Sequence, residues 1–312
     1  MLRAAGRGGA GRLDAILYRA CGPGRFYVSE HESSFARGPD FPSCLDNLSR
    51  QVLHDVADGV YQLPRRQILR TFVAVIEAGL PLRDGQRRQP FACRVDLLAD
   101  QKGRRSFDAQ CPTNYLREGG ATLHEALRGL ADVIAARYEG ESITDLMREL
   151  PKQPLMTSFS LGPAPGPQWA SAAIVRRDGR YEACALGAPV SAPGKGPVES
   201  LERLERRLAG RGFGAPIATS REPVYAALDV PLQLKERPLV HRFFIAIAPH
   251  DGRTPHYAAY APQAGIALRA KTLDDALDGM GEKLARAFRG KRYNDARLSL
   301  RETPILTAAK IA

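Results

Sequence analysis

The side chains best suited to specific chemistry are basic residues in two short segments of the first third of the chain. Each segment places three Lys or Arg residues within six positions, and residues 61–117 hold eleven Lys or Arg against five Asp or Glu. Clustered guanidinium groups repel one another and are stabilised when phosphates or carboxylates bind between them. The pattern predicts a single basic face that contacts nucleic-acid backbone or an acidic protein partner. The predicted binding residues are Arg83, Arg87, Arg88, Lys102, Arg104 and Arg105.

The net charge of the whole chain is a weaker guide than this local excess. The formal net charge is +11, but arginine outnumbers lysine by 37 to 8, as a GC-rich coding sequence would produce without selection for binding. Three interpretations of the basic segments therefore stay open: a nucleic-acid contact, a protein contact and a plain solvated surface.

Motifs for catalysis are weak. The glycines of residues 6–11 have dinucleotide-binding spacing, but no strand precedes them, and the Gly-Lys-Gly of residues 194–196 lacks the rest of a phosphate loop. His250 and His256, with Asp251 between them, have the side chains for metal binding or acid–base work, but Asp-Gly is turn chemistry first. The sequence predicts no catalytic residue, no metal site and no cofactor.

The cysteine pattern limits the cellular compartments and the kinds of site that the sequence is compatible with. The five cysteines are widely spaced and contain no Cys-x-x-Cys pair, so neither structural zinc nor a disulfide framework is expected. Cys111, which precedes a proline, is a poor candidate for a nucleophile. The chain has no run of 18 uncharged apolar residues, so no membrane span is expected. Together these features predict a cytoplasmic protein.

The elements that position these residues are indicated by an internal match. Residues 121–140 (ATLHEALRGLADVIAARYEG) and 271–290 (KTLDDALDGMGEKLARAFRG) align without a gap, and Leu127 and Leu277 take the same position, where we expect both to be buried. In each copy a threonine is followed three residues later by a carboxylate, which is typical of a helix N-terminus. These pairs are Thr122 with Glu125 and Thr272 with Asp275.

The same offset of 150 extends upstream and aligns Val95 with Ile245. Two strand-like runs around a turn precede each helix, and two weaker units of the same kind occur near the N-terminus and after residue 168. The sequence therefore predicts an α+β fold of four β-hairpin-plus-helix units in two pseudo-duplicated halves. The predicted helices lie near 43–60, 122–138, 198–210 and 272–289.

The predicted organisation has four parts. A flexible N-terminus precedes the first two-unit half, and a Pro/Gly-rich linker separates it from the second two-unit half. These parts are residues 1–14, 15–150, 151–167 and 168–312.

The segments SFDAQCPTNYLREGGATLHEALRGLADVIAARY and AAYAPQAGIALRAKTLDDALDGMGEKLARAF resemble the core of HicB-type antitoxin domains. In that core a strand ends in an aromatic residue and a proline, a Gly-containing segment follows, and a helix begins with a "TL-x-x-AL" pattern. The resemblance implies a compact β-β-β-α module, related in shape to RNase H but without its metal-binding carboxylates. It also implies a partner, because such modules bind a small RNA-cleaving toxin.

From these features we expect a non-catalytic binding protein, connected with toxin–antitoxin or mobile-element systems. Its modules would contact nucleic acid or a protein partner through the basic face. The alternatives are an enzyme whose active site lies at the junction of the two halves and a scaffold subunit of a larger assembly.

Overall fold

A computed structural model describes residues 12–19, 27–31, 34–60, 67–149, 155–160, 168–210, 218–250 and 256–311. The described part is α+β, with two antiparallel sheets of eight strands each and six helices. The predicted fold class is confirmed at this level. No helix within these residues is long and apolar enough to cross a membrane.

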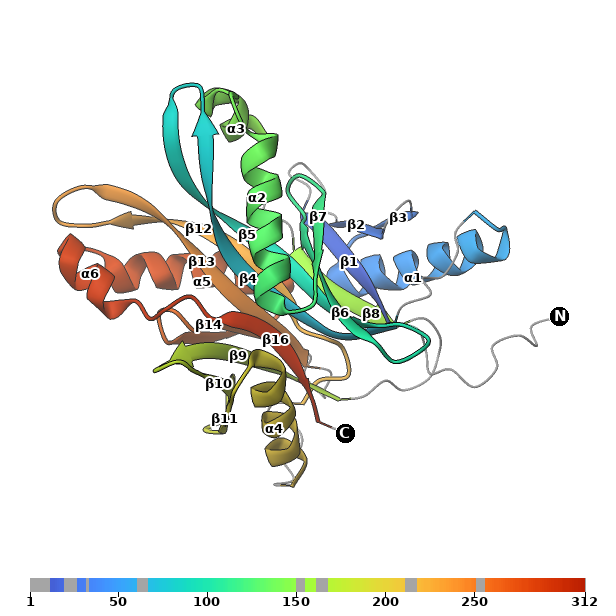
Figure 1. Ribbon diagram of the computed structural model, residues 1–312. Coiled ribbons are helices and arrows are strands. Elements are labelled where there is room, and N and C mark those ends of the chain that lie inside the picture. The colour runs from blue at the N-terminus through green and yellow to red at the C-terminus, as the bar shows by residue number, and fades with distance from the viewer. Residues whose placement is uncertain are drawn as a thin grey trace.

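The elements follow in chain order (Figure 1). They are β1 (Arg12–Arg19), β2 (Tyr27–His31), β3 (Ser34–Gly38), α1 (Phe41–Ala57), β4 (Gln67–Leu82), β5 (Gly85–Ala99), β6 (Arg105–Cys111), β7 (Leu116–Gly120), α2 (Leu123–Arg137), α3 (Ile143–Glu149), β8 (Leu155–Ser160), β9 (Trp169–Arg177), β10 (Arg180–Ala185), β11 (Ser191–Gly194), α4 (Pro197–Gly210), β12 (Val224–Gln233), β13 (Pro238–His250), β14 (His256–Ala261), β15 (Ile266–Ala270), α5 (Leu273–Phe288), α6 (Tyr293–Ser299) and β16 (Ile305–Lys310).

Each sheet combines strands from both predicted halves. The first sheet has the order β15-β14-β13-β12-β8-β1-β2-β3, and the second has the order β11-β10-β9-β16-β4-β5-β6-β7. In the first sheet β8 pairs with β1 on one side and with β12 on the other. In the second, β16 pairs with β9 and with β4. Residues 15–150 and 168–312 are therefore joined through both sheets and do not form one sheet each.

The predicted linker, residues 151–167, contains a central strand. Leu155 to Ser160 form β8, which lies in the middle of the first sheet. Leu155 and Met156 are buried there. The Pro- and Gly-rich residues that flank this short run made the whole segment look like a connector, but pairing with two other strands stabilises an extended conformation of six residues.

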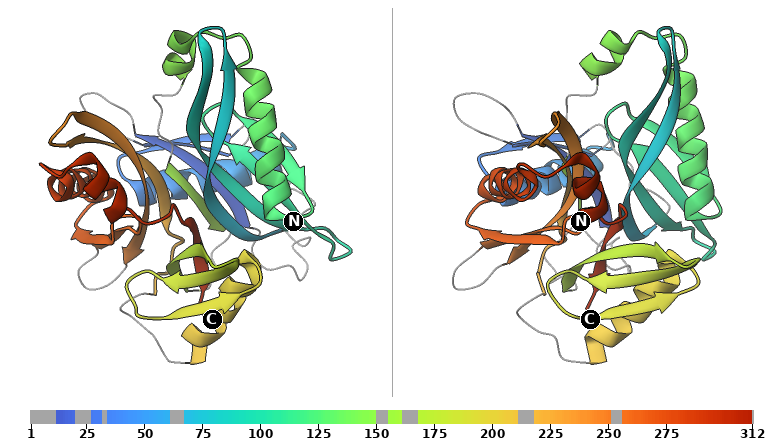
Figure 2. Two further views of the ribbon diagram at one scale, coloured as in Figure 1. Left: turned by 60° about the vertical axis from the view of Figure 1, so that its left-hand side comes forward. Right: turned by 90° about the vertical axis from the view of Figure 1, so that its left-hand side faces the viewer.

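The helices cover the outer faces of the two sheets, and the inner faces pack against each other. One core joins α2 and α4 to the second sheet, another joins α1 and α5 to the first sheet, and a third contains residues of both sheets. Figure 2 shows α2 and α4 on one side of the molecule and α5 on the other. The order of layers is thus helix, sheet, sheet, helix.

The helix N-termini form as their sequences predict. Thr122 and Thr272 are the N-caps of α2 and α5, and each side chain accepts a hydrogen bond from the backbone N–H three residues later. The Glu125 carboxylate completes a capping box at α2. The four predicted helices correspond to α1, α2, α4 and α5 and are confirmed, with ends that differ by at most three residues. The short helices α3 and α6 were not predicted.

The prediction that Leu127 and Leu277 are both buried is confirmed for only one of the two leucines. Leu277 is 6% exposed, whereas Leu127 is only partly buried. Both leucines lie on the core side of their helices, so the helical register is right, and the difference lies in what packs over them.

Strand pairing corrects the gapless alignment of the upstream strands. Val95 pairs with Ala109, and it is Ile247 that pairs with Ala259, the residue 150 positions later. Val95 therefore corresponds to Ile247 and not to Ile245, because the β5–β6 hairpin is two residues longer than the β13–β14 hairpin. Apolar residues alternate along both strands, so a shift of two residues leaves the pattern unchanged.

Candidate binding sites

The six predicted binding residues lie in two separate groups. Arg83, Arg87 and Arg88 are at the β4–β5 turn, and the other three are at the β5–β6 turn. These turns are at opposite ends of β5, and 15 residues of strand span about 45 Å. All six side chains are exposed, but the structure does not bring them to a single face.

The group at the β4–β5 turn is divided again by the pleat of the sheet. Arg87 is paired with Leu80, and Arg88 is paired with Gly79. Successive residues of a strand project to opposite faces. Leu80 is part of the core under α2, so Arg87 projects on the helix-covered side of the sheet and Arg88 on the side that faces the other sheet.

The two groups also differ in how far their charge is neutralised. At the β5–β6 turn, Arg104 donates to the Asp100 carboxylate at 2.7 Å, and Arg105 lies 3.8 Å from the Glu202 carboxylate. Hydrogen bonds from the backbone N–H and then the side chain of Arg104 lower the pKa of Asp100. Among the described residues, no carboxylate forms an ion pair with Arg83, Arg87 or Arg88.

The β4–β5 turn is held in place by the segment between α2 and α3. The backbone N–H of Gly140 donates to the Pro81 carbonyl at 2.9 Å, and the N–H of Arg83 donates to the Glu141 carbonyl at 3.0 Å. Gly140 has φ +74, a conformation that favours glycine. Asp84 accepts a hydrogen bond from the N–H of Ile143. These contacts fix the backbone that carries the three arginines and occupy Asp84, the nearest acidic residue in the sequence.

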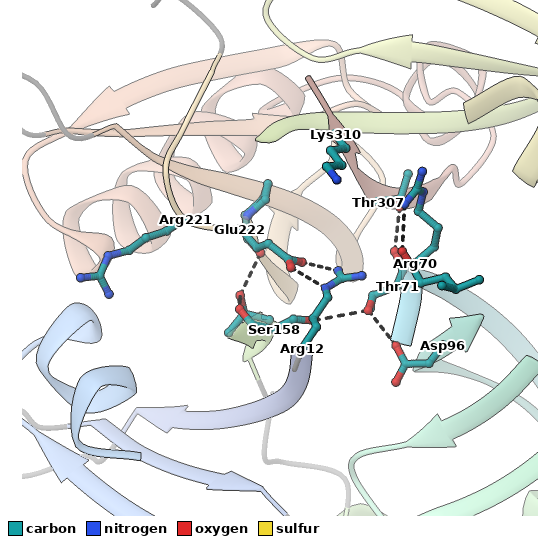
Figure 3. A network of polar contacts seen from close by, with 12 residues as sticks. Arg12, Arg70, Thr71, Asp96, Ser158, Arg221, Glu222, Thr307 and Lys310 are labelled. Atoms are coloured by element: carbon teal, nitrogen blue, oxygen red, sulfur yellow. Dashed lines mark hydrogen bonds and ion pairs between the residues drawn. The ribbon is translucent and has the colours of Figure 1, made fainter. Parts of the chain in front are cut away.

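A second polar cluster is buried between the sheets, and sequence reasoning missed it. Arg94 is 1% exposed and forms a bidentate ion pair with Asp96, with both N···O distances 2.9 Å. Asp96 also accepts a hydrogen bond from Thr71. Arg94 reaches across to the first sheet, where it donates to the Thr157 carbonyl at 2.5 Å and to the Ser158 hydroxyl at 3.2 Å. Figure 3 shows Thr71, Asp96 and Ser158 in this layer.

Another ion pair lies beside this cluster. Arg12 forms a bidentate pair with Glu222, and the Arg12 guanidinium stacks 5.1 Å from the Trp169 ring centroid. Burial, and then the Glu222 charge, raise the pKa of the Tyr225 hydroxyl well above its ordinary value. Arg12 and Arg94 are each paired with a carboxylate, so each of these two ion pairs is electrically neutral. Arg12 lies before the predicted start of the first half, which is one reason that sequence reasoning overlooked it.

The histidine and cysteine candidates form no metal-binding group among the described residues. The rings of His250 and His256 stack with centroids 4.8 Å apart, and Asp251 lies outside the described residues. Within the described part, no group of three or more His, Cys, Asp or Glu side chains could hold a metal ion. Cys93 and Cys111 are buried as free thiols. Burial raises the pKa of Cys93, and a hydrogen bond from Cys93 lowers the pKa of Cys111.

Cavities that open at the surface of the described part include one between the sheets and one between two helices. One, of about 460 Å³, lies at the margin between the sheets and includes Cys184, Arg176 and Arg301 in its lining. The other, of about 610 Å³, lies between the N-termini of α2 and α4 and has a mainly apolar lining. Its lining residues come from both predicted halves, and none of the six predicted basic residues lines either cavity.

A scan against protein-family models and searches of curated proteins and of solved structures found no match to this chain.

Proposed function

We propose that this protein is a non-catalytic binding protein that contacts nucleic-acid backbone through the β4–β5 turn. The observation that carries the proposal is the set of Arg83, Arg87 and Arg88, which are exposed on a braced turn and form no ion pair within the described residues. Unneutralised guanidinium groups on a fixed backbone gain most when phosphates bind. Lys102, Arg104 and Arg105 contribute less, because Asp100 and Glu202 already offset two of their charges.

We further propose that the chain is built from four HicB-like modules that arose by duplication of a two-module block. Two observations support this. The strand order and helix caps of β4–β7 with α2 recur in β12–β15 with α5. Gly140 and Gly290, with φ +74 and +71, each donate a hydrogen bond to the hairpin that precedes their helix. The free thiols of the described cysteines fit a cytoplasmic location.

An acidic protein partner is the alternative occupant of the same turn, as one subunit of a larger complex. An enzyme with its site at the junction of the two halves is the second alternative. The cavity between α2 and α4 favours it, because His124 and Glu199 come to that lining from different halves. Within the described residues, however, the hydrogen bond of His124 is to Arg128 and not to a nucleophile.

The test compares two triple variants in a salt titration of binding to a DNA duplex of about 20 base pairs and to a matched RNA duplex. Arg83→Ser/Arg87→Ser/Arg88→Ser should weaken binding by about tenfold or more at about 0.1 M salt. It should also reduce the slope of log K against log salt by about one for each phosphate that is no longer neutralised. The matched control, Lys102→Ser/Arg104→Ser/Arg105→Ser, removes the same formal charge and should change the slope less.

Equal effects of the two triple variants would show that net charge, and not the β4–β5 turn, drives binding. Absence of binding to either duplex at about 0.05 M salt would refute the nucleic-acid proposal and leave the acidic protein partner. Thermal midpoints of both variants should stay close to that of the native protein, since all six side chains are exposed.

A further inference from the structure

The cavity between the N-termini of α2 and α4 has a shape and lining that the proposed nucleic-acid contact does not use. Its volume is about 610 Å³, within the usual range for small-molecule sites. Strand residues Phe107, Tyr181 and Ile305 contribute to it from β6, β10 and β16. Leu127 and Val198 contribute from the two helices. Leu127 is only partly buried because one side of it faces this cavity.

The first sheet contains a position that corresponds to this cavity. It can be located by aligning helix α1 of the first sheet with helix α4 of the second. The buried residues of α1 and α4 have the same spacing, with an offset of 156 that relates Cys44, Leu45, Leu48 and Val52 to Ser200, Leu201, Leu204 and Leu208. A Cβ atom on Gly38 or on Gly194 would lie 2.4 Å from the backbone N of Cys44 or Ser200, respectively. β3 therefore approaches α1 as closely as β11 approaches α4. At the same offset of 156, Phe41 corresponds to Pro197.

At the counterpart the space is filled. Phe41 is 1% exposed and belongs to the same buried apolar cluster as Leu155, Leu273 and Leu277. Those three leucines correspond, at an offset of 150, to the cavity residues Ile305, Leu123 and Leu127. The chain therefore supplies an aromatic ring to one outer face, whereas Pro197 leaves an open cavity at the other.

We propose that this cavity is a binding site for a small uncharged aromatic molecule, whose ring takes the place that Phe41 fills in the first sheet. The inference rests on the proposed correspondence between the first and third modules, and not on nucleic-acid binding. The N-terminus of α2 offers little to an anion, because Thr122 and Glu125 already cap it. The Glu199 carboxylate, which accepts from the Lys195 N–H, lies in the lining and disfavours an anion further. Apolar contact with the ring is what remains to drive binding.

The test is a fluorescence titration with N-phenyl-1-naphthylamine, an uncharged aromatic probe that becomes fluorescent in apolar sites. The native protein should bind it saturably, with one site per chain. Pro197→Phe should weaken binding at least about tenfold by filling the cavity, with a thermal midpoint equal to or above that of the native protein. Leu127→Phe fills the same space from α2 and should act in the same direction even if the change at Pro197 disturbs folding.

The control is Val240→Ala, which removes an apolar side chain that is 65% exposed on β13, outside this cavity. It should leave probe binding unchanged. Failure of the native protein to bind the probe would overturn the proposal, and so would retained binding in folded Pro197→Phe and Leu127→Phe variants. Because DNA binding is measured separately at the β4–β5 turn, loss of one activity leaves the other open to test.

Discussion

The hairpins β4–β5 and β12–β13 occupy corresponding places in the two sheets but differ in what they bury between the sheets. In β5 the inward positions hold Arg94 and Asp96, whereas the corresponding positions in β13 hold Ala246 and Ala248. β4–β5 lies between β16 and β6, β12–β13 lies between β8 and β14, and a helix covers the outer face of each hairpin. β12–β13 has its ion pair elsewhere, between Asp229 and the less buried Arg242, so this arrangement of strands does not need a charged pair at these two positions.

What the charged pair adds is a set of directional contacts between the sheets. Arg94 in the second sheet donates to Thr157 and Ser158 of β8 in the first sheet. Apolar contacts hold surfaces together without fixing their relative position, whereas hydrogen bonds to a buried guanidinium require one position. β13 makes one such contact in return, from Arg242 to the Pro90 carbonyl of β5 at 3.1 Å. We infer that both hairpins set the alignment of the sheets and that the larger share comes from the fully buried Arg94.

The largest expected effect comes from removing one partner of the buried pair. Asp96→Ala leaves the Arg94 guanidinium buried without its carboxylate and should lower the free energy of unfolding by about 3–5 kcal/mol. Urea denaturation followed by circular dichroism measures this loss.

The matched variant is Arg94→Met/Asp96→Ala, which makes β5 resemble β13. It should be less destabilised than Asp96→Ala alone, because no uncompensated charge stays buried. A double variant that is less stable than the single variant would mean that the contacts to β8 contribute more than the cost of burying the charges, and the comparison of the two hairpins would have to be revised.

The second expected effect concerns the corresponding leucines of the covering helices. Leu277→Ala should lower the free energy of unfolding by about 2–5 kcal/mol, since the side chain is 6% exposed in a buried apolar cluster. Leu127→Ala should cost clearly less, because Leu127 borders the cavity between α2 and α4. Equal costs, measured by the same denaturant titration, would contradict the open cavity and with it the difference between the two outer faces.

The smallest expected effect is a change in pH dependence at β13. Burial lowers the pKa of His241 below its ordinary value near 6.5, although Asp229 opposes the shift. The folded protein then binds the proton less readily than the unfolded chain, so this stabilising contribution is present above pH 6.5 and is lost as the pH falls below it. The Nε2 atom of His241 is buried without a hydrogen-bond partner in the described part of the chain.

His241→Gln introduces the residue found at the corresponding position of β5, Gln89. The variant should show a smaller fall in thermal midpoint between about pH 7 and pH 5 than the native protein. A difference of the opposite sign would show that His241 gains a carboxylate partner on protonation and that burial is not the dominant influence.

The sequence by itself determined the local structure. The Thr122 and Thr272 caps are short-range hydrogen bonds between residues three apart, so they can be recognised without knowing the fold. The spacing of apolar residues located four of the six described helices in the same way. The alternation along β5 and β13 predicted strands correctly but could not fix their correspondence, because a shift of two residues preserves it.

Only the tertiary structure decided how these units combine. The pairing of β8 with β12 and of β16 with β4 joins segments that are distant in the sequence, and no local pattern encodes which edges will meet. It also decided that Arg83 and Arg105 lie at opposite ends of one long strand, since the length of β5 could not be read from a run of mixed polar and apolar residues. The burial of Arg94 required contacts from both sheets, and a charged residue within a strand is ordinarily expected to be exposed. These features depend on long-range packing, which accounts for why local sequence patterns did not reveal them.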